Sequence, residues 1–217
     1  MAKVPKLVNP ESVLVRQPLF SGVHQDGPSV SIIAIGASAG GIQAIRAVLE
    51  PLRKDLSCPV LVVLHIAPQY DSHAAEVLGR TTGLKVKQAS NNDVLRPGVV
   101  YIAPPDFHLN VQNGAVLLTH SPAINFSRPS IDSMFHSIAT HYGKHAVAVV
   151  LTGSGIDGSE GMRAIKAAGG FNIVQDPHTA QFSSMPDAAV NTTCADRVLP
   201  LGDIGRFLSA MCGPIHS

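Results

Sequence analysis

The feature that most constrains the fold is a change of hydrophobic pattern at Ser31. After this residue, short continuous apolar runs alternate with segments of about ten or more residues that have a helical pattern. The runs are Ile32 to Ile35, Val60 to Leu64, Val99 to Ile102, Ala146 to Leu151 and Phe171 to Val174, with a weaker one at Leu84 to Val86. This alternation is typical of βαβ units, and the lack of polar alternation within the runs predicts strands covered on both faces. We therefore expect an α/β fold, a three-layer αβα sandwich with a mostly parallel, doubly wound sheet.

Local signals predict further elements. Leu109 to Val111 and Val116 to Leu118 flank Asn113-Gly114, a strong two-residue turn signal, so we expect a β-hairpin appended to the sheet. Ser130 is a suitable cap for a helix that ends at Gly143, and Asp203 for the last helix.

Length and composition favour one globular domain. The chain has 217 residues, of which 45% are hydrophobic and 14% charged. Residues 1–29 carry several prolines and glycines without a sustained period, so we interpret them as an irregular N-terminal leader, followed by a catalytic domain over 30–217. The leader lacks the apolar core of a signal peptide, and no later run approaches the roughly 20 apolar residues that span a bilayer. We expect no membrane insertion and a cytoplasmic location.

Charge and cysteine usage exclude two classes of function. The formal net charge is +1 and the charged residues are dispersed, which argues against a nucleic-acid partner. Cys58, Cys194 and Cys212 are far apart and form no CxxC pair, which argues against a disulfide framework or a thiolate metal site. His141 and His145 have helical spacing, but no third ligand is near and the His-Glu-x-x-His pattern is absent. We expect neither a metal nor an organic cofactor.

Three polar residues follow buried runs and are candidates for catalysis. Ser38 comes after the first run, His65 directly after the second, and Asp157 in the glycine-rich turn after Ala146 to Leu151. The carboxyl ends of parallel strands share one edge of a sheet, where ligands bind. A nucleophile, a base and an orienting carboxylate at one edge predict a serine hydrolase.

Ser38 has the most informative surroundings. Gly36-Ala37-Ser38-Ala39-Gly40 matches the G-x-S-x-G elbow, a tight strand-to-helix turn that exposes the serine hydroxyl. Backbone N–H groups of Ala39, Gly40 and Gly41 at the start of the helix are suited to binding an oxyanion. The alternatives are a turn that only connects strand and helix, or one that cradles a phosphate.

His65 and Asp157 have structural alternatives as well. A histidine at the end of a buried strand is often a hydrogen-bonded structural residue, and Asp157 is also placed to cap the helix that follows it. In α/β-hydrolases of the lipase type the order is serine, acid, histidine, whereas here it is Ser38, His65, Asp157. The residues alone leave open a different serine-hydrolase lineage or a later histidine such as His178.

Several blocks, in register, resemble the catalytic domain of bacterial chemotaxis protein-glutamate methylesterases, the CheB family. The resemblance covers about residues 30 to 212 and rests on eight segments. They are Ile35-Gly-Ala-Ser-Ala-Gly-Gly41, His65-Ile-Ala-Pro68, Tyr101-Ile-Ala-Pro-Pro-Asp106, Arg128-Pro-Ser-Ile-Asp132, Leu151-Thr-Gly-Ser-Gly-Ile-Asp-Gly158, Gln175-Asp-Pro177, Met185-Pro-Asp-Ala-Ala189 and Val198-Leu-Pro-Leu201.

The resemblance implies a triad and a reaction. The family's serine, histidine and aspartate fall on Ser38, His65 and Asp157, in preference to His178. The implied reaction is hydrolysis of glutamate γ-methyl esters on methyl-accepting chemotaxis receptor helices, with release of methanol. Deamidation of receptor glutamines is implied as a second activity, and no cofactor is implied.

Departures from the family pattern concern substrate and control. Ala39 stands where the family usually has Thr, and Ser154 where it usually has Met. Arg128 occupies a position at which the family has a basic or polar residue, so it is a candidate partner for a carboxylate near the substrate. Residues 1–29 are too few for the receiver domain that commonly precedes the family's catalytic domain, so we expect control by a separate receiver or regulatory protein.

Two other functions compete with the methylesterase. Ala39 and Ser154 favour a serine esterase or amidase of the same fold that acts on a different substrate. A non-catalytic binding module that uses the sheet edge is the third candidate, although Gly36, Gly40 and Gly41 do not give the Gly-x-Gly-x-x-Gly spacing of dinucleotide sites.

Overall fold

A seven-stranded sheet forms the centre of the molecule. The computed structural model describes residues 30–65 and 73–213, so the predicted leader at 1–29 lies outside the described residues. The strand order is β3-β4-β2-β1-β7-β8-β9, and every neighbouring pair is parallel. The strands are β1 (Ile32–Ala37), β2 (Val60–Leu64), β3 (Lys85–Gln88), β4 (Val99–Ile102), β7 (Ala146–Val150), β8 (Phe171–Gln175) and β9 (Arg197–Leu199).

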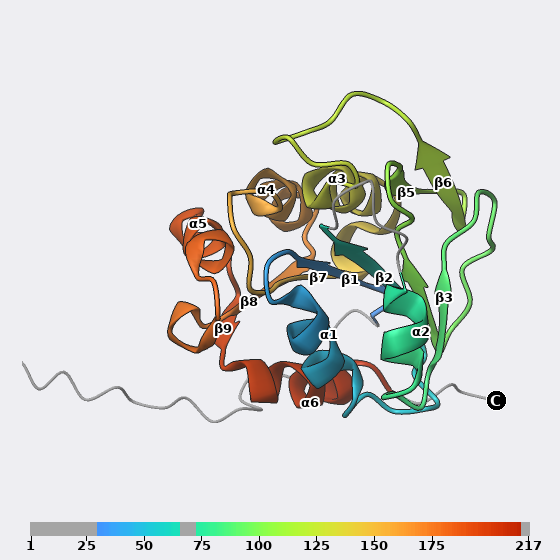
Figure 1. The fold of residues 1–217 in the computed structure, drawn as a ribbon, viewed down its shortest axis with the longest axis horizontal. Helices are drawn as coiled ribbons and strands as arrows, with labels where there is room; N and C mark the ends of the chain where they lie inside the picture. The colour runs from blue at the N-terminus through green and yellow to red at the C-terminus, as the bar shows by residue number, and fades with distance from the viewer. Residues whose placement is uncertain (1–29, 66–72, 214–217) are drawn as a thin grey trace, which may run out of the picture.

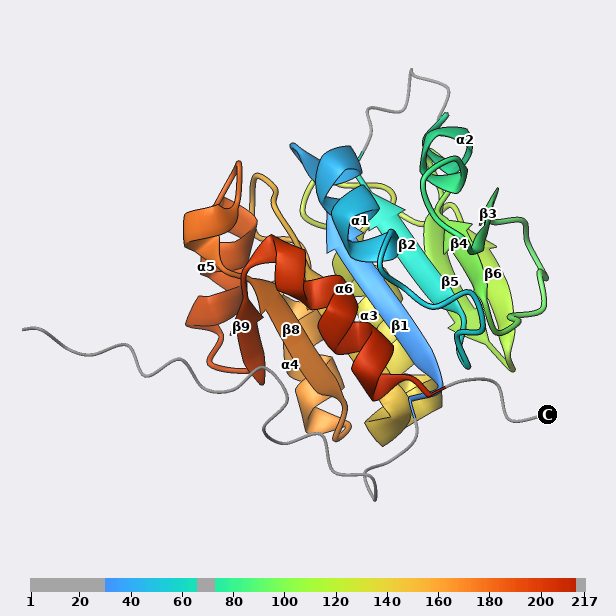
Figure 2. The same ribbon diagram turned by 90° about the horizontal axis from the view of Figure 1, so that it is seen from below.

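Helices cover both faces of this sheet (Figures 1 and 2). α1 (Gly41–Leu49), α2 (Ala74–Gly79) and α6 (Leu201–Met211) pack on one face, and α3 (Ile131–Tyr142), α4 (Ser159–Ala167) and α5 (Ser184–Asn191) on the other. Short 3₁₀ turns occupy Gly143–His145 and Pro177–Thr179. The predicted three-layer α/β sandwich is therefore confirmed.

The two cores follow from the alternation of side chains along the central strands. Ile33 and Ile35 of β1 point into the core shared with α1 and α6, whereas Ile32 and Ala34 point into the core under α3 and α4. All six residues of β1 are buried. A strand that is buried on both faces has no polar alternation, which is why the continuous apolar runs predicted these strands.

The predicted hairpin forms a sheet of its own. β5 (His108–Gln112) and β6 (Ala115–Thr119) pair antiparallel, and Asn113 and Gly114 both have positive φ, 51° and 75°, as a two-residue turn of this kind requires. The hairpin lies beside α3 and is joined to it by side chains: Ser137 Oγ accepts from the Val111 backbone N–H at 3.1 Å. It is not a strand pair of the seven-stranded sheet, but it is also attached to the segment between β3 and β4, where Val94 forms an antiparallel bridge with Ala115.

Helix ends agree with the sequence in one place and differ in another. Ser130 caps α3 and accepts from the Ser133 N–H at 3.3 Å. Asp203 lies inside the first turn of α6, and Pro200 occupies the cap position, so the predicted cap at Asp203 is wrong. An acidic residue in the first turn still stabilises a helix through its dipole, which explains the resemblance to a cap signal. Among the described residues, none of the helices has the length and apolar character needed to cross a membrane.

Candidate active site

Ser38, His65 and Asp157 follow three adjacent strands. Ser38 comes directly after β1 and His65 directly after β2, while Asp157 lies in the loop from β7 to α4. In the sheet, β1 stands between β2 and β7. The carboxyl ends of these strands therefore bring all three segments to one edge of the sheet, as parallel pairing requires.

The Ser38 turn is held by backbone contacts on both sides. The Ser38 N–H donates to the Thr152 carbonyl at 3.0 Å, and the Gly41 N–H donates to the Ser38 carbonyl at 2.8 Å. Gly40 has a φ of 72°, a left-handed conformation that glycine adopts without strain, and α1 begins at the next residue. Within the described part of the chain, the N–H groups of Ala39 and Gly40 have no hydrogen-bond partner.

Gly153 lies against Ser38 because it has no side chain. A Cβ at Gly153 would stand 2.8 Å from Ser38 Cβ and 2.3 Å from the sulfur of Met185. The loop after β7 therefore contacts the serine turn directly. Thr152, which is buried, adds a second tie, since its hydroxyl donates to the Ala39 carbonyl at 3.1 Å.

His65 and Asp157 form a direct pair. Nε2 of His65 lies 2.9 Å from Oδ2 of Asp157, and the side chains are 16% and 3% exposed. The carboxylate can only accept, so this Nε2 carries the proton, and Nδ1 is the ring nitrogen left free to accept another one. The Ser38 hydroxyl makes no hydrogen bond among residues 30–65 and 73–213, so the structure contains one of the two links that a serine–histidine–aspartate chain requires.

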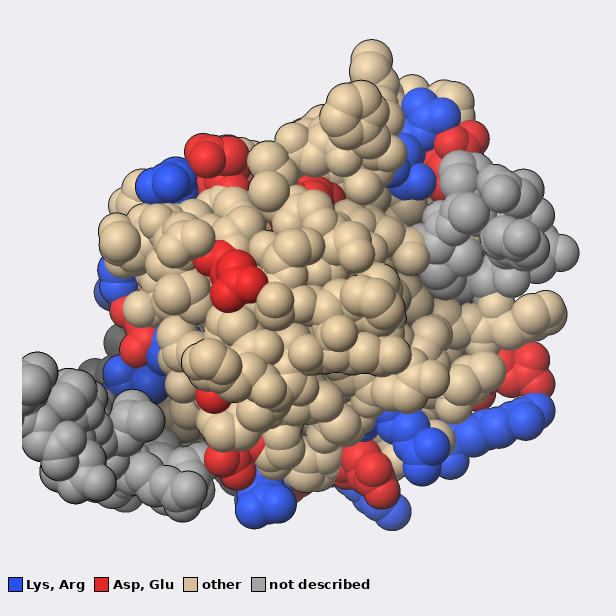
Figure 3. Space-filling model, turned by 60° about the vertical axis from the view of Figure 1, so that its left-hand side comes forward, with Lys and Arg blue, Asp and Glu red and all other residues tan. Residues whose placement is uncertain are grey.

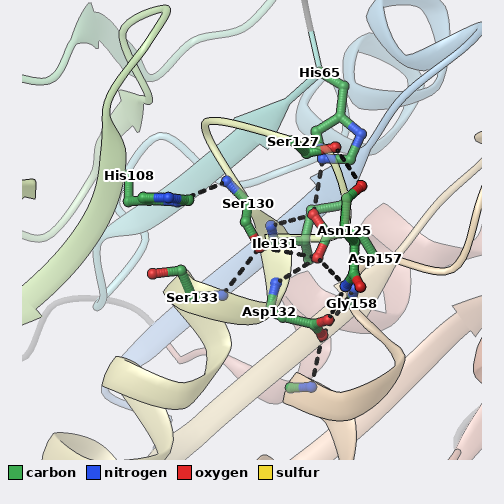
Figure 4. Close-up of polar contacts among 11 residues, drawn as sticks. His65, His108, Asn125, Ser127, Ser130, Ile131, Asp132, Ser133, Asp157 and Gly158 are labelled. Carbon is green, nitrogen blue, oxygen red and sulfur yellow. Dashed lines mark hydrogen bonds and ion pairs between the residues drawn. The ribbon is translucent and has the colours of Figure 1, made fainter. Parts of the chain in front are cut away.

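Asp157 is surrounded by donors (Figure 4). Besides His65, it accepts from Ser130 Oγ at 2.9 Å and from the backbone N–H groups of Ile131 and Asp132 at 2.7 and 3.1 Å. Burial alone would raise the pKa of this carboxyl, but the bonds from His65, Ile131 and Asp132 outweigh it and lower the pKa to about 2. Asp157 is therefore an ionised, fixed acceptor at neutral pH.

Asp157 does not cap its own helix. Gly158 is the N-cap residue of α4, and the Asp157 carboxylate binds the first N–H groups of α3 instead. Asp132, in the first turn of α3, in turn binds N–H groups at the start of α4. Its Oδ1 accepts from Gly158 N–H at 2.9 Å and from Gly161 N–H at 2.7 Å. Asp132 in the first turn of α3 and Asp157 in the loop before α4 thus each bind free N–H groups at the start of the other helix.

The two carboxylates differ in the direction of their pKa shifts. Burial is the main cause that raises the pKa of Asp132 to about 6, the nearby Asp157 charge adds to it, and the Gly161 and Gly158 N–H groups act against it. Asn125 lies between the two, donating to Asp132 at 2.7 Å and to Asp157 at 3.4 Å. Its amide therefore screens two acidic groups from each other.

His108 supports this arrangement from the hairpin. Its ring is completely buried, with Nδ1 accepting from the Ser130 N–H at 3.2 Å and Nε2 3.1 Å from the Pro122 carbonyl. An imidazole that accepts at Nδ1 and donates at Nε2 is neutral. Through Ser130, the hairpin is connected to the carboxylate that binds His65.

The structure places the other predicted site residues in different surroundings. Gly40 and Ala39 lie in the Ser38 turn, and Ser154 is exposed in the loop directly after Gly153. Arg128 does bind a carboxylate, but this carboxylate is Asp106 of the same chain, at 2.5 and 2.9 Å. Arg128 therefore ties the segment before α3 to the segment before β5.

His178 is not part of this arrangement. It is exposed in the 3₁₀ turn after β8, and its backbone N–H donates to Asp176. Among the described residues, no group of three or more His, Cys, Asp or Glu side chains is placed to hold a metal ion.

Sequence reasoning missed the residues that position Asp157. Asp132, Asn125 and His108 come from α3, from the turn before it and from the hairpin, and no spacing rule connects them. The one available signal was the block Arg128-Pro-Ser-Ile-Asp132, which contains Ser130 and Asp132 but carried no role for them.

Comparisons with known proteins agree with this fold. The sequence profile described as CheB methylesterase matches residues 33–208. A putative protein-glutamate methylesterase/protein-glutamine glutaminase of Leptospira interrogans is 37% identical over 176 residues, which cover 81% of this chain and 91% of that protein. A protein-glutamate methylesterase/protein-glutamine glutaminase of Anaeromyxobacter dehalogenans is 42% identical over 179 residues, which cover 82% of this chain and 52% of that protein.

A solved structure gives the same result in three dimensions. The crystal structure of the Thermotoga maritima CheB methylesterase catalytic domain superposes with a TM-score of 0.79 at 37% identity, covering 84% of this chain and 98% of that one. The chain spans about half the length of the Anaeromyxobacter relative and nearly all of the catalytic domain. It belongs to the CheB methylesterase family.

Proposed function

We propose that this protein is a serine hydrolase that demethylates glutamate γ-methyl esters of chemoreceptors and releases methanol. The observation that carries the proposal is the His65–Asp157 pair at 2.9 Å, at the sheet edge where Ser38 ends β1, in a chain of the CheB methylesterase family. The relatives named above are described as protein-glutamate methylesterases. Ser38, His65 and Asp157 are the proposed catalytic residues.

In the proposed reaction, the Ser38 hydroxyl attacks the ester carbonyl and His65 takes its proton. Because Nε2 already donates to Asp157, Nδ1 is the nitrogen that accepts this proton. The positive imidazolium is then stabilised by the ionised Asp157. His65 returns the proton to the departing methoxide, so methanol leaves and a glutamyl ester with Ser38 remains.

Water completes the cycle by the same route. His65 removes a proton from water, which attacks the glutamyl ester, and the Ser38 oxygen leaves with that proton. The free N–H groups of Ala39 and Gly40 are the proposed donors to the oxyanion in both halves. A backbone contact does not depend on the Ala39 side chain, so the replacement of the family's usual Thr leaves it intact.

Deamidation of receptor glutamines is the second candidate activity. The relatives are described as protein-glutamine glutaminases in addition to methylesterases. A glutamine side chain places its carbonyl carbon the same number of bonds from the backbone as the γ-methyl ester does, and it differs in the leaving group, ammonia in place of methanol. The proposed groups serve both reactions, with His65 as the proton donor to the leaving group.

The test measures methanol release from a methylated chemoreceptor by the wild type and by Ser38→Ala. We expect release by the wild type and a loss of at least about 10³-fold in the variant. Release that is unchanged in Ser38→Ala excludes the serine mechanism. Turnover of a generic ester without methanol release from the receptor favours an esterase or amidase with a different substrate, the alternative to which Ala39 and Ser154 point.

A further inference from the structure

Phe126 is exposed to an unusual degree for a large apolar residue. Its relative exposure is 105%, which means that its ring has no cover from the described residues. Large aromatic side chains lose favourable free energy when they stand fully in water. A single exposed apolar residue is common, so exposure needs a second observation before it indicates a role.

The second observation is the backbone conformation at Phe126. Its φ is 61°, and Asn125 before it has a φ of 49°, so both central residues of the turn are left-handed. The backbone N–H and carbonyl groups of Ile124 and Ser127 close this turn at 2.8 and 3.1 Å. Such a turn favours Asn followed by Gly, and a bulky residue at positive φ is strained. Phe126 is therefore kept where glycine would be more stable.

The third observation is where the turn is anchored. Asn125 donates to Asp132 at 2.7 Å and to Asp157 at 3.4 Å, and Figure 4 shows it beside the carboxylate that pairs with His65. The exposed ring thus projects from a turn that is attached to the proposed catalytic aspartate. Strained residues that the surroundings hold in place cluster at functional sites.

Other exposed apolar side chains lie on loops of the same edge. Ile156, which directly precedes Asp157, is 61% exposed, and Phe182 is 42% exposed in the segment before α5. The Phe182 carbonyl accepts from the Gly153 N–H at 2.9 Å, which places this segment next to the loop that contacts Ser38. Figure 3 shows that uncharged side chains make up most of the face that includes α4 and α5, with charged ones mainly toward its margins.

We propose that Phe126 is a docking residue for the protein substrate, which it contacts through an apolar side chain next to the esterified glutamate. This rests on the proposed function. A γ-methyl ester carries no charge, and the exposed side chains of Phe126, Ile156 and Phe182 carry none either, so they match a substrate helix that presents the ester beside apolar residues. A small ester has no such neighbours and does not reach Phe126. The residue therefore sets affinity for protein substrates and takes no part in the bond-breaking steps.

Two substitutions distinguish the effect of removing the Phe126 ring from the effect of relieving the backbone strain. Phe126→Gly removes the ring and relieves the positive φ, whereas Phe126→Ala removes the ring and keeps a Cβ at that φ. We expect both to raise the KM for a methylated receptor fragment, lowering kcat/KM by about 10- to 30-fold with little change in kcat. Only Phe126→Gly is expected to raise the melting temperature, by about 2–4 °C.

Controls show whether the effect belongs to the protein substrate. Hydrolysis of p-nitrophenyl acetate is expected to be unchanged in both variants, because the small ester bypasses the ring. Phe126→Tyr retains an aromatic ring and is expected to keep the wild-type KM. Val94→Ala removes an apolar side chain of 61% exposure in the segment between β3 and β4, and no change is expected. Parallel losses on both substrates, or no loss on either, overturn the proposal.

A binding measurement separates this proposal from the proposed function. A benzophenone amino acid is placed at position 126, or at position 94 as a control, in Ser38→Ala protein and irradiated with the receptor fragment. We expect a cross-link from position 126 only, whether or not the wild type releases methanol. Methanol release without this cross-link leaves the methylesterase standing and rejects Phe126 as its docking residue.

Discussion

Asp157 has more hydrogen bonds than the orientation of one imidazole requires. Two backbone N–H groups, the Ser130 hydroxyl and His65 all donate to it, and the two backbone N–H groups can only donate. An asparagine in this place would turn an NH₂ group toward one set of donors. The site therefore depends on the charge of Asp157 and not only on its shape.

Asp157→Asn is expected to lose both activity and stability. The lost orientation of His65 lowers kcat by about 10³- to 10⁴-fold, and the unpaired donors lower the free energy of unfolding by about 2–4 kcal/mol. Ester hydrolysis and urea unfolding at pH 7 measure the two effects. Ser38→Ala is the control, with a similar loss of activity and an unfolding free energy within about 0.5 kcal/mol of the wild type. A fully active Asp157→Asn protein contradicts the proposed triad.

The two carboxylates are expected to affect stability in opposite directions with pH. The pKa of Asp157, about 2, is below its ordinary value, so its contribution is present above about pH 4 and is lost as the pH falls through 2. The pKa of Asp132, about 6, is above the ordinary value, so the native state binds the proton more tightly than the unfolded state. Its contribution is complete below about pH 4 and is lost as the pH rises through 6.

Asp132→Asn tests this sign, because asparagine does not titrate. Between pH 4 and 7 the unfolding free energy of the wild type, minus that of the variant, is expected to fall by an amount on the order of 2 kcal/mol. Urea titrations at half-unit pH intervals give this difference. A difference that is flat or rises over the same interval shows that Asp132 is ionised throughout.

At the scale of helices, α3 and α4 begin at one place and stabilise each other. The first N–H groups of α3 bind Asp157, and those of α4 bind Asp132, so the two N-termini supply the field that keeps a buried carboxylate charged. Ser130 takes part twice, as the cap of α3 and as a donor to Asp157.

Ser130→Ala is expected to weaken the cap and the carboxylate together. We expect a loss of about 1–2 kcal/mol in the free energy of unfolding and a decrease of about tenfold in kcat, with little change in KM. Ser133→Ala is the matched control, since the Ser133 hydroxyl donates to Asn110 at 2.8 Å and does not touch Asp157. Equal changes in kcat for the two variants contradict a specific role for Ser130.

The loop after β7 is expected to tolerate no side chain at Gly153. A Cβ there meets both Met185 and Ser38, so Gly153→Ala should destabilise the protein by about 1–3 kcal/mol and lower kcat by about 100-fold. Adding Met185→Ala removes one of the two clashes. The double variant is therefore expected to be less destabilised than the sum of the two single substitutions, because the methyl group introduced at position 153 fills part of the space left by Met185, but not to recover activity, measured by urea unfolding and ester hydrolysis. Recovery of both shows that the contact with Ser38 is harmless.

For the molecule as a whole, the sequence predicts the sheet because its central strands are buried on both faces. The sequence did not predict β9, because this strand lacks such burial. Its three residues are only partly buried, Val198 is 44% exposed, and no apolar run marks the strand. β9 is a strand because it pairs with β8, and this long-range contact cannot be seen in the local sequence pattern.

The site likewise contains residues that the sequence predicted and residues that only the structure reveals. Ser38, His65 and Asp157 each follow a strand that a local pattern predicts, and parallel topology then brings them to one edge. Asn125, His108 and Asp132 act through contacts between the hairpin, a turn and two helix ends, which only the folded chain defines. The sequence predicted that Arg128 would bind a carboxylate, but residue type alone could not identify which one. Its partner is Asp106 and not a substrate.

The reactivity of Cys58 and Cys212 indicates whether α6 stays packed against the sheet. Cys58 precedes β2, Cys212 follows α6, both are buried, and their sulfurs lie 3.6 Å apart. The bond to Cys212, and then burial, raise the pKa of the Cys58 thiol, which suppresses the reactive thiolate. Exposing this pair requires α6 to leave the core that it shares with α1 and the sheet.

Cys194 is the remaining cysteine of the chain. We therefore expect only one of the three thiols to react quickly with a disulfide reagent at pH 8. Cys194 is only partly buried and accounts for the fast phase, while Cys58 and Cys212 react at the rate at which the native fold opens. Cys194→Ser is expected to remove the fast phase and leave the slow one unchanged. The slow rate should equal the unfolding rate measured independently in urea and extrapolated to water. A slow phase much faster than global unfolding shows that α6 detaches separately, whereas agreement shows that the C-terminal helix and the strand that precedes His65 open as one unit.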